Sequence, residues 1–457
     1  EKWQIKEEWH GGFGSKNNKE NKRMFHRSIS TVLLYALLST TSHAFAPSPS
    51  FHAVSSKRST ISSNVKPSSL FSTAEELIPD ENRRAELFQH LLRDLQIEGV
   101  PLLGCDADQV HTLNAAAWTT MADMSEEDSA QRACLVMERI PMDALRAFVD
   151  DFTVLKTQKR LMNHLPELSR LSVSLIGKGA GPALLIESGE RTAEEKSEHM
   201  GRLAAASVYE ESKVTAALRS FVDRVVIGCK ACPYITTADL AGSGLEAKGV
   251  IPGPIGYRYS GTSDVCMALA TFWNCICELL GTPEAELSST VLSLPGIGPG
   301  KDKAAHDRFA AVVELVGRNL CLFRGDGVFG LVHFHPAYTR EDIFLPDKPS
   351  YGHLPPQSWI RPMLRMNGNV EEADSLTEDD IALSDYQRRA PHTMINILRA
   401  SQLGAAVGGK SIVDLDLGDG VTEKASGIST YSRNAIRLAK EGKESLQSAL
   451  DQEIAMQ

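Results

Sequence analysis

The feature that most constrains the fold of this chain is a regular alternation of strand-length and helix-length apolar segments in its second half. Glycine and proline separate the segments, and the apolar residues of the longer ones recur at helical spacing. The strand candidates are residues 256–260, 289–295 and 328–336, and the helix candidates are residues 263–280 and 302–320. Strands joined by helices of about 15 residues form crossover units, which imply a sheet with parallel pairs. The sequence therefore predicts an α/β domain over residues 206–410 with a small mixed sheet and crossover helices; an α+β arrangement is the alternative.

The section ahead of this domain is predicted to be helical. In residues 75–205, apolar side chains recur at helical spacing, for example at Leu87, Leu91 and Leu95. Glycines and a short apolar run interrupt this pattern at residues 174–189, after which helical spacing resumes. We therefore expect an all-helical section over residues 75–205.

The chain beyond the third strand has three further segments of different composition. Residues 342–383 are rich in proline and then in acidic residues, which predicts an excursion on the surface of the domain. Residues 391–403 and 432–453 have helical spacing, the second of them within a C-terminal helical extension over residues 411–457. No internal repeat is apparent in the sequence.

Residues 24–73 have the composition of two targeting signals in series. A short basic start at Met24 and an apolar run predict a signal peptide over residues 24–44, and residues 45–73, with ten serines and no acidic residue, predict a disordered transit peptide. The junction "SHAFAPS" resembles that of proteins imported into the secondary plastids of diatoms and related algae. We expect a plastid location reached through the secretory route, with plain secretion as the alternative. Residues 1–23 are interpreted as readthrough upstream of the natural start.

Charge and hydropathy limit the partners that this chain can have. Without residues 1–73 the chain carries 38 basic and 54 acidic residues, a net charge of about -16, which repels nucleic-acid phosphates. The apolar run in the signal peptide is too short for a permanent membrane helix. We therefore expect no nucleic-acid partner and no permanent membrane span in the mature chain. A small anionic metabolite or a protein partner fits the composition, and no motif indicates a cofactor.

The cysteine pair in "RVVIGCKACPYI" is the first candidate for chemistry. Cys229 and Cys232 have the spacing of a redox or metal-binding pair, but they follow a predicted helix end at Gly228, where the helix dipole disfavours a thiolate. No second cysteine pair lies at the spacing of a zinc site. Packed thiols are therefore favoured over a redox pair, which stays open as an alternative.

Histidines and glycine-rich turns give weaker signals. His333 and His335 lie two residues apart on a strand, hence on one face, but no third ligand is evident and a hydrogen-bonded pair is favoured over a metal site. The turn "LPGIGPGKDK" lacks the first glycine and the Ser or Thr of a phosphate-binding loop, so a flexible turn is favoured there. "GKGAG" at residues 177–181 is equally unspecific.

Two arginines and a histidine lie at the start of the predicted helix at residues 391–403. Arg388, Arg389 and His392 at a helix start make an anion site plausible, because exposed amide groups and guanidinium groups both attract anions. Surface charge pairing is the simpler alternative.

Three motifs occur in a fixed order along the chain: "VVIGCKACPY", "GLVHFHPAY" and "DYQRRAPHTMINILRAS". Together they resemble the domain-of-unknown-function family 1415 of bacteria and algae. In that family a helix ends in Ile-Gly before Leu-Cys-Pro-Phe, a strand ends in Phe-His-Pro-x-Tyr, and a later helix opens with Asn-Arg-Ser-Pro-Tyr-Pro. The resemblance covers about residues 217–403. The matching positions are Cys232, Pro233, Phe334, His335, Pro336, Tyr338, Tyr386, Arg389, Pro391, Met394, Leu398 and Arg399.

The resemblance implies a single constellation of Cys232, His335 and Arg389 as nucleophile, base and anion clamp. Leu294 and Asn396 stand where the family has His, and Ala400 stands where it has Glu, so a reaction that needs those groups would be lost here. Cys229 has no counterpart in the family.

Three hypotheses follow for the function. The first is an enzyme-like domain that binds a small anion, with Cys232 and His335 as catalytic groups and Arg389, Tyr338, Tyr386 and Arg399 as ligand-binding groups. The second is a non-catalytic binding or assembly factor in the plastid. The third is a protein that responds to redox state through a Cys229–Cys232 disulfide.

Overall fold

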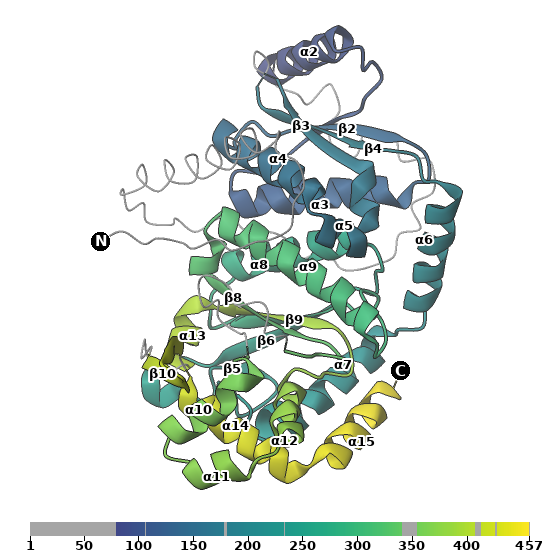
Figure 1. Cartoon of the computed structure of the whole chain (residues 1–457). Coiled ribbons are helices and arrows are strands. Elements are labelled where there is room, and N and C mark those ends of the chain that lie inside the picture. Colours follow the sequence, from purple (N-terminus) through teal and green to yellow (C-terminus); the bar gives the residue numbers. More distant parts are fainter. Residues whose placement is uncertain are drawn as a thin grey trace. The chain divides into compact units, whose positions relative to one another are not determined.

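The computed structural model describes residues 79–456 except 106, 178–180, 233, 341–353, 407–412 and 426. The predicted readthrough, signal and transit segments, residues 1–73, lie outside the described residues. The described chain is a mixed α/β protein, as predicted, and contains two mixed sheets and a separate two-stranded hairpin (Figure 1).

The first sheet has the strand order β1-β2-β4-β3. β1 runs parallel to β2, and the other two pairings are antiparallel. Its strands are β1 (Leu102–Gly104), β2 (Gln131–Val136), β3 (Leu171–Ile176) and β4 (Ala183–Ser188). Its helices are α2 (Pro79–Asp94), which precedes it, α3 (Val110–Glu126) between β1 and β2, and α4 (Met142–Thr157), α5 (Lys159–His164) and η2 (Pro166–Arg170) between β2 and β3.

The second sheet has the strand order β5-β6-β7-β9-β8. β6 runs parallel to β7, and the pairings of β7 with β9 and of β9 with β8 are antiparallel. Its strands are β5 (Leu240–Ala241), β6 (Gly253–Tyr259), β7 (Ser289–Ser293), β8 (Phe329–Phe334) and β9 (Met394–Arg399). Helix α8 (Val265–Gly281) connects β6 to β7, and α9 (Lys303–Leu322) with η5 (Gly325–Gly327) connects β7 to β8.

The two sheets are built from the same unit, which the sequence did not reveal. If β5 is set aside, each consists of strand, helix, strand, helical connection, strand and strand, and each has the first strand parallel to the second and the fourth strand between the second and the third. We call residues 102–188 the first repeat and residues 253–399 the second repeat.

The register of the strands makes the correspondence specific. Gly104 pairs with Val136 and Tyr259 pairs with Ser293, and in both repeats the first helix begins six positions later, at Val110 and Val265. Helices α3 and α8 both have 17 residues, and each carries a buried tryptophan at its ninth position. Those tryptophans are Trp118 and Trp273.

Equivalent backbone hydrogen bonds follow the same register. The amide of Cys105 donates to Val136 and that of Ser260 donates to Ser293, both at 3.0 Å. The residue after the second strand donates to the residue before the fourth strand in each repeat, Met137 to Pro182 at 3.1 Å and Leu294 to Thr393 at 2.9 Å. The repeats therefore share backbone geometry although their sequences differ.

The repeats pack against each other through their first helices, α3 and α8. One large apolar cluster joins Leu135 and Ile186 of the first sheet, both helices with their tryptophans, and Ile395 of the second sheet. Helix α2 covers the opposite face of the first sheet. On the opposite face of the second sheet lie α7 (Glu211–Phe221), the π-helix η3 (Val222–Gly228) and the segment after it.

The repeats differ most in the connection between their last two strands. It spans residues 177–182 in the first repeat and residues 335–393 in the second. The described part of the longer connection forms α10 (Gln357–Met366), α11 (Val370–Ser375), α12 (Glu378–Ala382) and η6 (Leu383–Gln387), and we call residues 335–393 the insertion.

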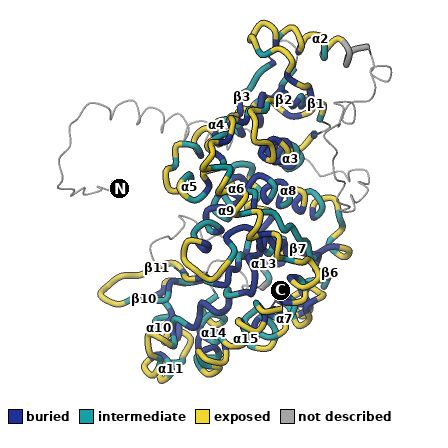
Figure 2. Tube along the Cα trace, turned by 90° about the vertical axis from the view of Figure 1, so that its right-hand side faces the viewer, coloured by how far each residue is buried: buried dark blue, intermediate teal, exposed yellow. Residues whose placement is uncertain are grey.

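The remaining elements are α6 (Ala193–Ala206) between the repeats, η4 (Glu246–Lys248), α13 (Ala400–Ala406), the hairpin β10 (Val413–Gly418) and β11 (Val421–Ala425), α14 (Ile428–Glu441) and α15 (Lys443–Ile454). Helix α10 packs on α14, so the predicted surface excursion has a core of its own, which includes Ile360 and Leu364. Figure 2 shows that α11 and the β10–β11 hairpin are largely exposed.

Several boundaries need correction. A helical segment, α2, does precede the first sheet, but the predicted all-helical section over residues 75–205 contains four strands. The predicted helix at residues 391–403 is strand β9 followed by α13, because Ile395 and Ile397 are β-branched and fill a position between two other strands. The predicted helix at residues 432–453 is divided at Gly442, whose φ of 82° favours glycine.

Candidate functional site

Cys229 and Cys232 follow the end of η3, as the sequence predicts, but they pack in different places. The Cys229 side chain contacts the apolar cluster of Leu446 and Leu450 on α15. Cys232 packs against the cluster that covers the α7 face of the second sheet. Burial raises the pKa of both thiols, with Glu441 adding to the effect at Cys229. Both are free thiols, and neither environment favours a reactive thiolate.

His335 follows β8 directly and is fully buried. Its ring forms hydrogen bonds with backbone groups. Its Nδ1 accepts from the amide of Ala337 at 2.9 Å, so Nε2 carries the proton and donates to the carbonyl of Gly298 at 2.9 Å. Burial lowers the pKa of His335 to about 4, with His306 acting in the same direction. The imidazole is neutral and both of its nitrogens are occupied.

The structure does not bring Cys232 and His335 together. The His335 ring stacks on Phe309 of α9 and contacts His306, so it points to the α9 side of the sheet. The preceding residue, Phe334, points to the other side, where it packs with Phe221 in the same cluster as Cys232. Side chains alternate between faces along a strand. The predicted pairing of Cys232 as nucleophile with His335 as base is therefore overturned.

The charged group near Cys232 is Arg388, one of three arginines at the two ends of the insertion. Arg340 lies at its start, and Arg388 and Arg389 lie near its end, after η6. The Arg388 guanidinium lies 4.9 Å from the centre of the Phe334 ring, and its charge partly offsets the rise in the pKa of Cys232. Nε of Arg389 donates to the carbonyl of Tyr338 at 3.0 Å. We call Arg340, Arg388 and Arg389 the arginine cluster.

Asp385 is the carboxyl group that lies beside Arg340 and Arg389 of the arginine cluster. It is 1% exposed, and its Oδ2 accepts from the amide of Arg340 at 3.3 Å and from Nε2 of Gln357 at 3.0 Å. Its Oδ1 is buried and has no hydrogen-bond partner among the described residues. Burial raises the pKa of Asp385 to about 6, although Arg389 and Arg340 oppose the shift. A buried carboxyl oxygen without a partner indicates that a further group belongs there.

Two tyrosines complete this neighbourhood. Burial raises the pKa of Tyr338 to about 12, and the charges of Arg388, Asp385 and Arg340 all act on it. Tyr431 of α14 interacts electrostatically with Arg388 and Cys232, and burial raises its pKa as well. Both phenols are therefore neutral hydrogen-bonding groups near the arginine cluster.

The remaining predicted ligand-binding residues have structural roles. Arg399 donates to three carbonyls at the end of α8 and beyond it, those of Leu279, Thr282 and Leu287, at 2.7 to 3.0 Å. Tyr386 lies under the Arg389 guanidinium at 4.5 Å and donates to Gln447 of α15 at 2.6 Å. His392 is buried before a strand instead of at a helix start.

No metal centre emerges from the described part of the chain. His333 and His335 lie on one face of the sheet, as predicted, since both contact Phe309. However, no group of three or more His, Cys, Asp or Glu residues in the described ranges is arranged to hold a metal ion. Among the same residues, no helix combines the length and the apolar character needed to cross a bilayer.

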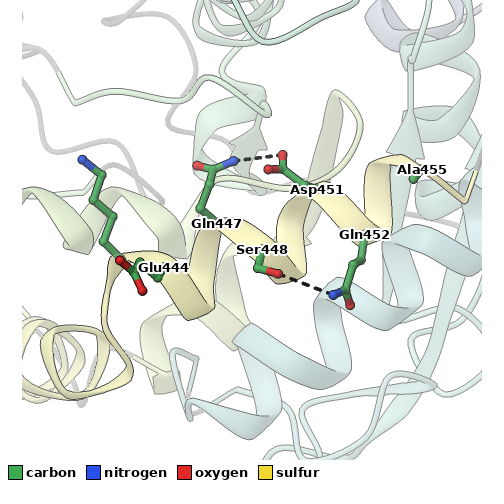
Figure 3. Close-up of a pocket in the computed structure, with 7 residues that line it drawn as sticks. Glu444, Gln447, Ser448, Asp451, Gln452 and Ala455 are labelled. Atoms are coloured by element: carbon green, nitrogen blue, oxygen red, sulfur yellow. Dashed lines mark hydrogen bonds between the residues drawn. The ribbon is translucent and has the colours of Figure 1, made fainter.

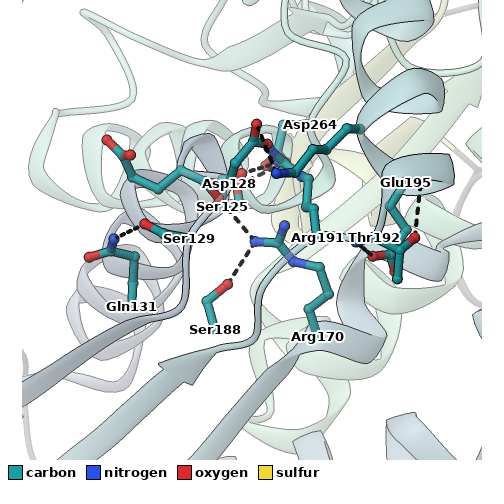
Figure 4. A network of polar contacts seen from close by, with 12 residues as sticks. Ser125, Asp128, Ser129, Gln131, Arg170, Ser188, Arg191, Thr192, Glu195 and Asp264 are labelled. Atoms are coloured by element: carbon teal, nitrogen blue, oxygen red, sulfur yellow. Dashed lines mark hydrogen bonds and ion pairs between the residues drawn. The ribbon is translucent and has the colours of Figure 1, made fainter.

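A polar network joins the repeats at the end of α3 (Figure 4). Ser125 donates to Oδ2 of Asp264 at 2.9 Å, and Asp264 caps α8 by accepting from the amide of Met267 at 3.0 Å. Arg191 is buried; it pairs with Asp128 at 3.0 Å and donates to the Ser125 carbonyl. Burial raises the pKa of Asp264. These contacts satisfy helix ends at the junction, so we interpret the network as structural.

Among the hollows on the surface of the described residues, two are well defined, and neither of these is lined by Cys232 or the arginine cluster. The larger, about 790 Å³, is an open depression along one side of α15, where Gln447 donates to Asp451 at 3.0 Å (Figure 3). The smaller, about 310 Å³, lies between α6, the turn after β7 and α9.

Sequence reasoning missed Asp385, Arg340, Gln357 and Tyr431. Asp385 belongs to the quoted motif "DYQRRAPHTMINILRAS", and its position three residues before Arg388 was the available signal. Arg340, Gln357 and Tyr431 had none, because only the folded insertion and α14 bring them close.

Comparisons of the chain with family models, with curated proteins and with solved structures found no match. The resemblance to family 1415 therefore stays a prediction from the quoted motifs.

Proposed function

We propose that the second repeat binds a small anion at the arginine cluster, beside Cys232. The observation that carries the proposal is the gathering of three arginines around Tyr338, together with the buried carboxyl group of Asp385, one of whose oxygens has no partner among the described residues. Even when Asp385 is ionised, these four groups sum to a charge of about +2, which favours an anion with two negative charges.

The four groups have different parts in this proposal. Arg389 is held by the Tyr338 carbonyl and the Tyr386 ring, so it fixes the shape of the site. Arg340 and Arg388 are half-buried, and their guanidinium groups present the charge. Nε of Arg340 is buried and has no partner among the described residues. Arginine suits this task because its planar fork matches the oxygens of a carboxylate or phosphate.

Asp385 gives the site a dependence on pH. Burial raises the pKa of Asp385 to about 6. Below that pH the protonated carboxyl group donates a hydrogen bond from Oδ1 to a bound anion, and above it the carboxylate repels the anion. We expect affinity for sulfate, which keeps both negative charges across this range, to rise as the pH falls from 7 to 5.

Isothermal titration calorimetry of the full chain with inorganic phosphate and with succinate tests the proposal. Arg388→Gln should weaken binding by roughly tenfold or more, since a charge-assisted hydrogen bond is lost. Arg365→Gln is the matched control, because Arg365 lies in the same insertion but pairs with Asp374 on the surface of α10. If neither anion binds at millimolar concentration, or if both variants bind alike, the site has another role.

Cys232 lies beside this site, so its accessibility reports occupancy. Alkylation of Cys232 should slow when phosphate is present, and Cys321, which is exposed, is the internal control. We propose no catalytic step for Cys232, because burial raises its pKa and the charged side chain that acts on it among the described residues is Arg388, which is not a base.

We further propose that the chain is directed to a plastid by residues 24–73, on the strength of their composition and of the "SHAFAPS" junction. A fluorescent protein fused after residue 73 should enter the plastid of a diatom, and deletion of residues 24–44 should leave it in the cytosol. Secretion of the fusion would favour the simpler signal peptide.

A further inference from the structure

The hollow beneath α6 lies where α/β folds often bind ligands. It is lined by Gly201, Ala205, Glu198 and Arg202 of α6, by Gly296 and Pro299 of the turn after β7, and by Arg308 of α9. This turn leaves the carboxyl end of β7, which runs parallel to β6. The carboxyl ends of parallel strands and the junctions between structural units are common ligand sites. Its volume of about 310 Å³ fits a small metabolite.

Helix α6 packs loosely against the rest of the protein. Of its 14 residues only Ala206 is buried. Its N-terminus is closed by its own capping box, in which Thr192 accepts from the amide of Glu195 and the Glu195 side chain accepts from the amide of Thr192. The capping box therefore stabilises the end of the helix locally, but few side chains of α6 are buried against the rest of the protein. The hollow lies along this loosely packed side of α6.

Gly201 has no steric reason to be glycine. A Cβ at this position would meet no atom within 4 Å, and its backbone is helical. Glycine inside a helix is destabilising relative to alanine. Gly296 differs, since a Cβ there would lie 2.4 Å from the carbonyl oxygen of Thr262 and 2.9 Å from Ala206. Gly201 therefore keeps space open on the side of α6 that lines the hollow, together with Ala205 one turn later.

The two arginines that line the hollow differ in how firmly they are paired. Arg308 is engaged with Glu167 and donates to the carbonyl of His164 at 2.7 Å. Arg202 pairs with Glu198 only at 3.7 Å, and Glu198 is well exposed. The guanidinium of Arg202 is thus weakly held. The walls formed by Gly201, Ala205, Gly296 and Pro299 offer no polar side chain.

We propose that this hollow binds a small monocarboxylate with an apolar body. The carboxylate pairs with Arg202, and the apolar body lies against Gly201, Ala205 and the turn at Gly296–Pro299. This site is separate from the arginine cluster and does not depend on the anion proposed there.

The test uses the full chain and phenylacetate as the probe, with phenylacetamide as its uncharged match. Titration calorimetry should show phenylacetate binding that is at least about tenfold tighter than that of phenylacetamide, because the amide cannot pair with Arg202. Gly201→Leu should abolish binding by filling the hollow, and Arg202→Gln should weaken it by about tenfold.

Gly317→Leu is the matched control, because Gly317 also lies inside a helix with no atom within 4 Å of a built Cβ, but it does not line the hollow. It should bind phenylacetate as the wild type does. If Gly201→Leu does not fold, Ala205→Leu fills the same space and makes the same test. Arg388→Gln alters the arginine cluster and not the hollow, so it should leave phenylacetate binding unchanged. A failure of the anion site at the arginine cluster can thus be told apart from a failure of the site in the hollow.

The proposal is overturned if phenylacetate does not bind at millimolar concentration. It is also overturned if binding persists in the filled variants, or if the amide binds as tightly as the acid.

Discussion

The first and second repeats have the same strand order and register, yet they close their last two strands in opposite ways. In the first repeat, Gly177 follows β3 with a φ of 98°, and a Cβ there would lie 1.9 Å from the carbonyl oxygen of Gly181. At the equivalent position of the second repeat stands His335, whose ring bridges the backbone at Gly298 and Ala337. The first repeat turns back at once, and the second opens into the insertion.

This difference locates the function that we propose. The arginine cluster and Asp385 all lie in the insertion, whereas the sequence of the corresponding connection in the first repeat, residues 177–182, contains no arginine and no aspartate. Where a fold is duplicated, shared positions maintain packing, and the segment that differs is the place to look for specific chemistry. The comparison yields four predictions, in order of decreasing effect.

Substitution of the equivalent tryptophans tests the shared core most severely. Trp118→Ala and Trp273→Ala should each lower the free energy of unfolding by about 3–5 kcal/mol, since each empties a large, fully buried site in one cluster. Urea denaturation measures both. Similar losses of unfolding free energy would support the equivalence of the two tryptophans. A loss below about 1 kcal/mol at only one of them would show that the two helices do not share a packing role.

Removal of the imidazole at His335 tests the closure of the second repeat. His335→Ala should cost about 2–4 kcal/mol, because two buried hydrogen bonds are lost and space opens beside Phe309. Denaturation at pH 7 checks the value. Were His335 a catalytic base instead of an anchor, the variant would keep its stability and lose only activity.

Arg399→Ala tests the end of α8, where one guanidinium donates hydrogen bonds to three carbonyls. The substitution should lower the free energy of unfolding by about 1.5–3 kcal/mol. In the first repeat, Arg170 donates to the Glu127 carbonyl at 3.4 Å and to Ser188 at 2.7 Å, so Arg170→Ala should cost less, about 1 kcal/mol. Thermal denaturation in one buffer compares the two. The reverse order would contradict the assignment of Arg399 as the stronger cap.

The pH dependence of stability should differ between the wild type and His392→Gln. Burial lowers the pKa of His392 to about 4, so between pH 4 and 6.5 the unfolded chain binds a proton there that the folded chain does not. This group therefore makes stability rise with pH in that window and fall as pH drops. Asp385 acts in the opposite direction, because its pKa is raised to about 6.

Denaturation from pH 4 to 7 measures this slope. Between pH 4 and 6.5 the free energy of unfolding should rise with pH less steeply in the variant than in the wild type, by up to about 1.4 kcal/mol per pH unit. An unchanged slope would mean that His392 titrates normally in the folded protein.

The sequence predicted the elements of the second repeat well, because each has a clear apolar period. Helices α8 and α9 and strands β6, β7 and β8 lie within a few residues of their predicted ranges. The strands of the first repeat were missed: β1 has only three residues, and the apolar run of β4 resembles a buried helix segment. The duplication was invisible because what the repeats share is register, with Val110 and Trp118 against Val265 and Trp273 as the remaining trace.

Only part of the candidate site could likewise be predicted from the sequence. The motif residues Cys232, Arg389 and Tyr338 were found, but the sequence could not show that His335 faces away from Cys232. Whether two side chains meet depends on the face of the sheet to which each strand residue points, and on where the connections end.

The mixed α/β class, the crossover helices and the positions of the unusual side chains could be predicted from the amino-acid sequence, because they follow from local periodicity and turn residues. Three features become visible only in the folded chain: one unit occurs twice, His335 is an anchor, and Asp385 lies beside Arg340 and Arg389. Those facts rest on contacts between segments far apart along the chain, such as Arg340 with Asp385, and no local pattern encodes such distances.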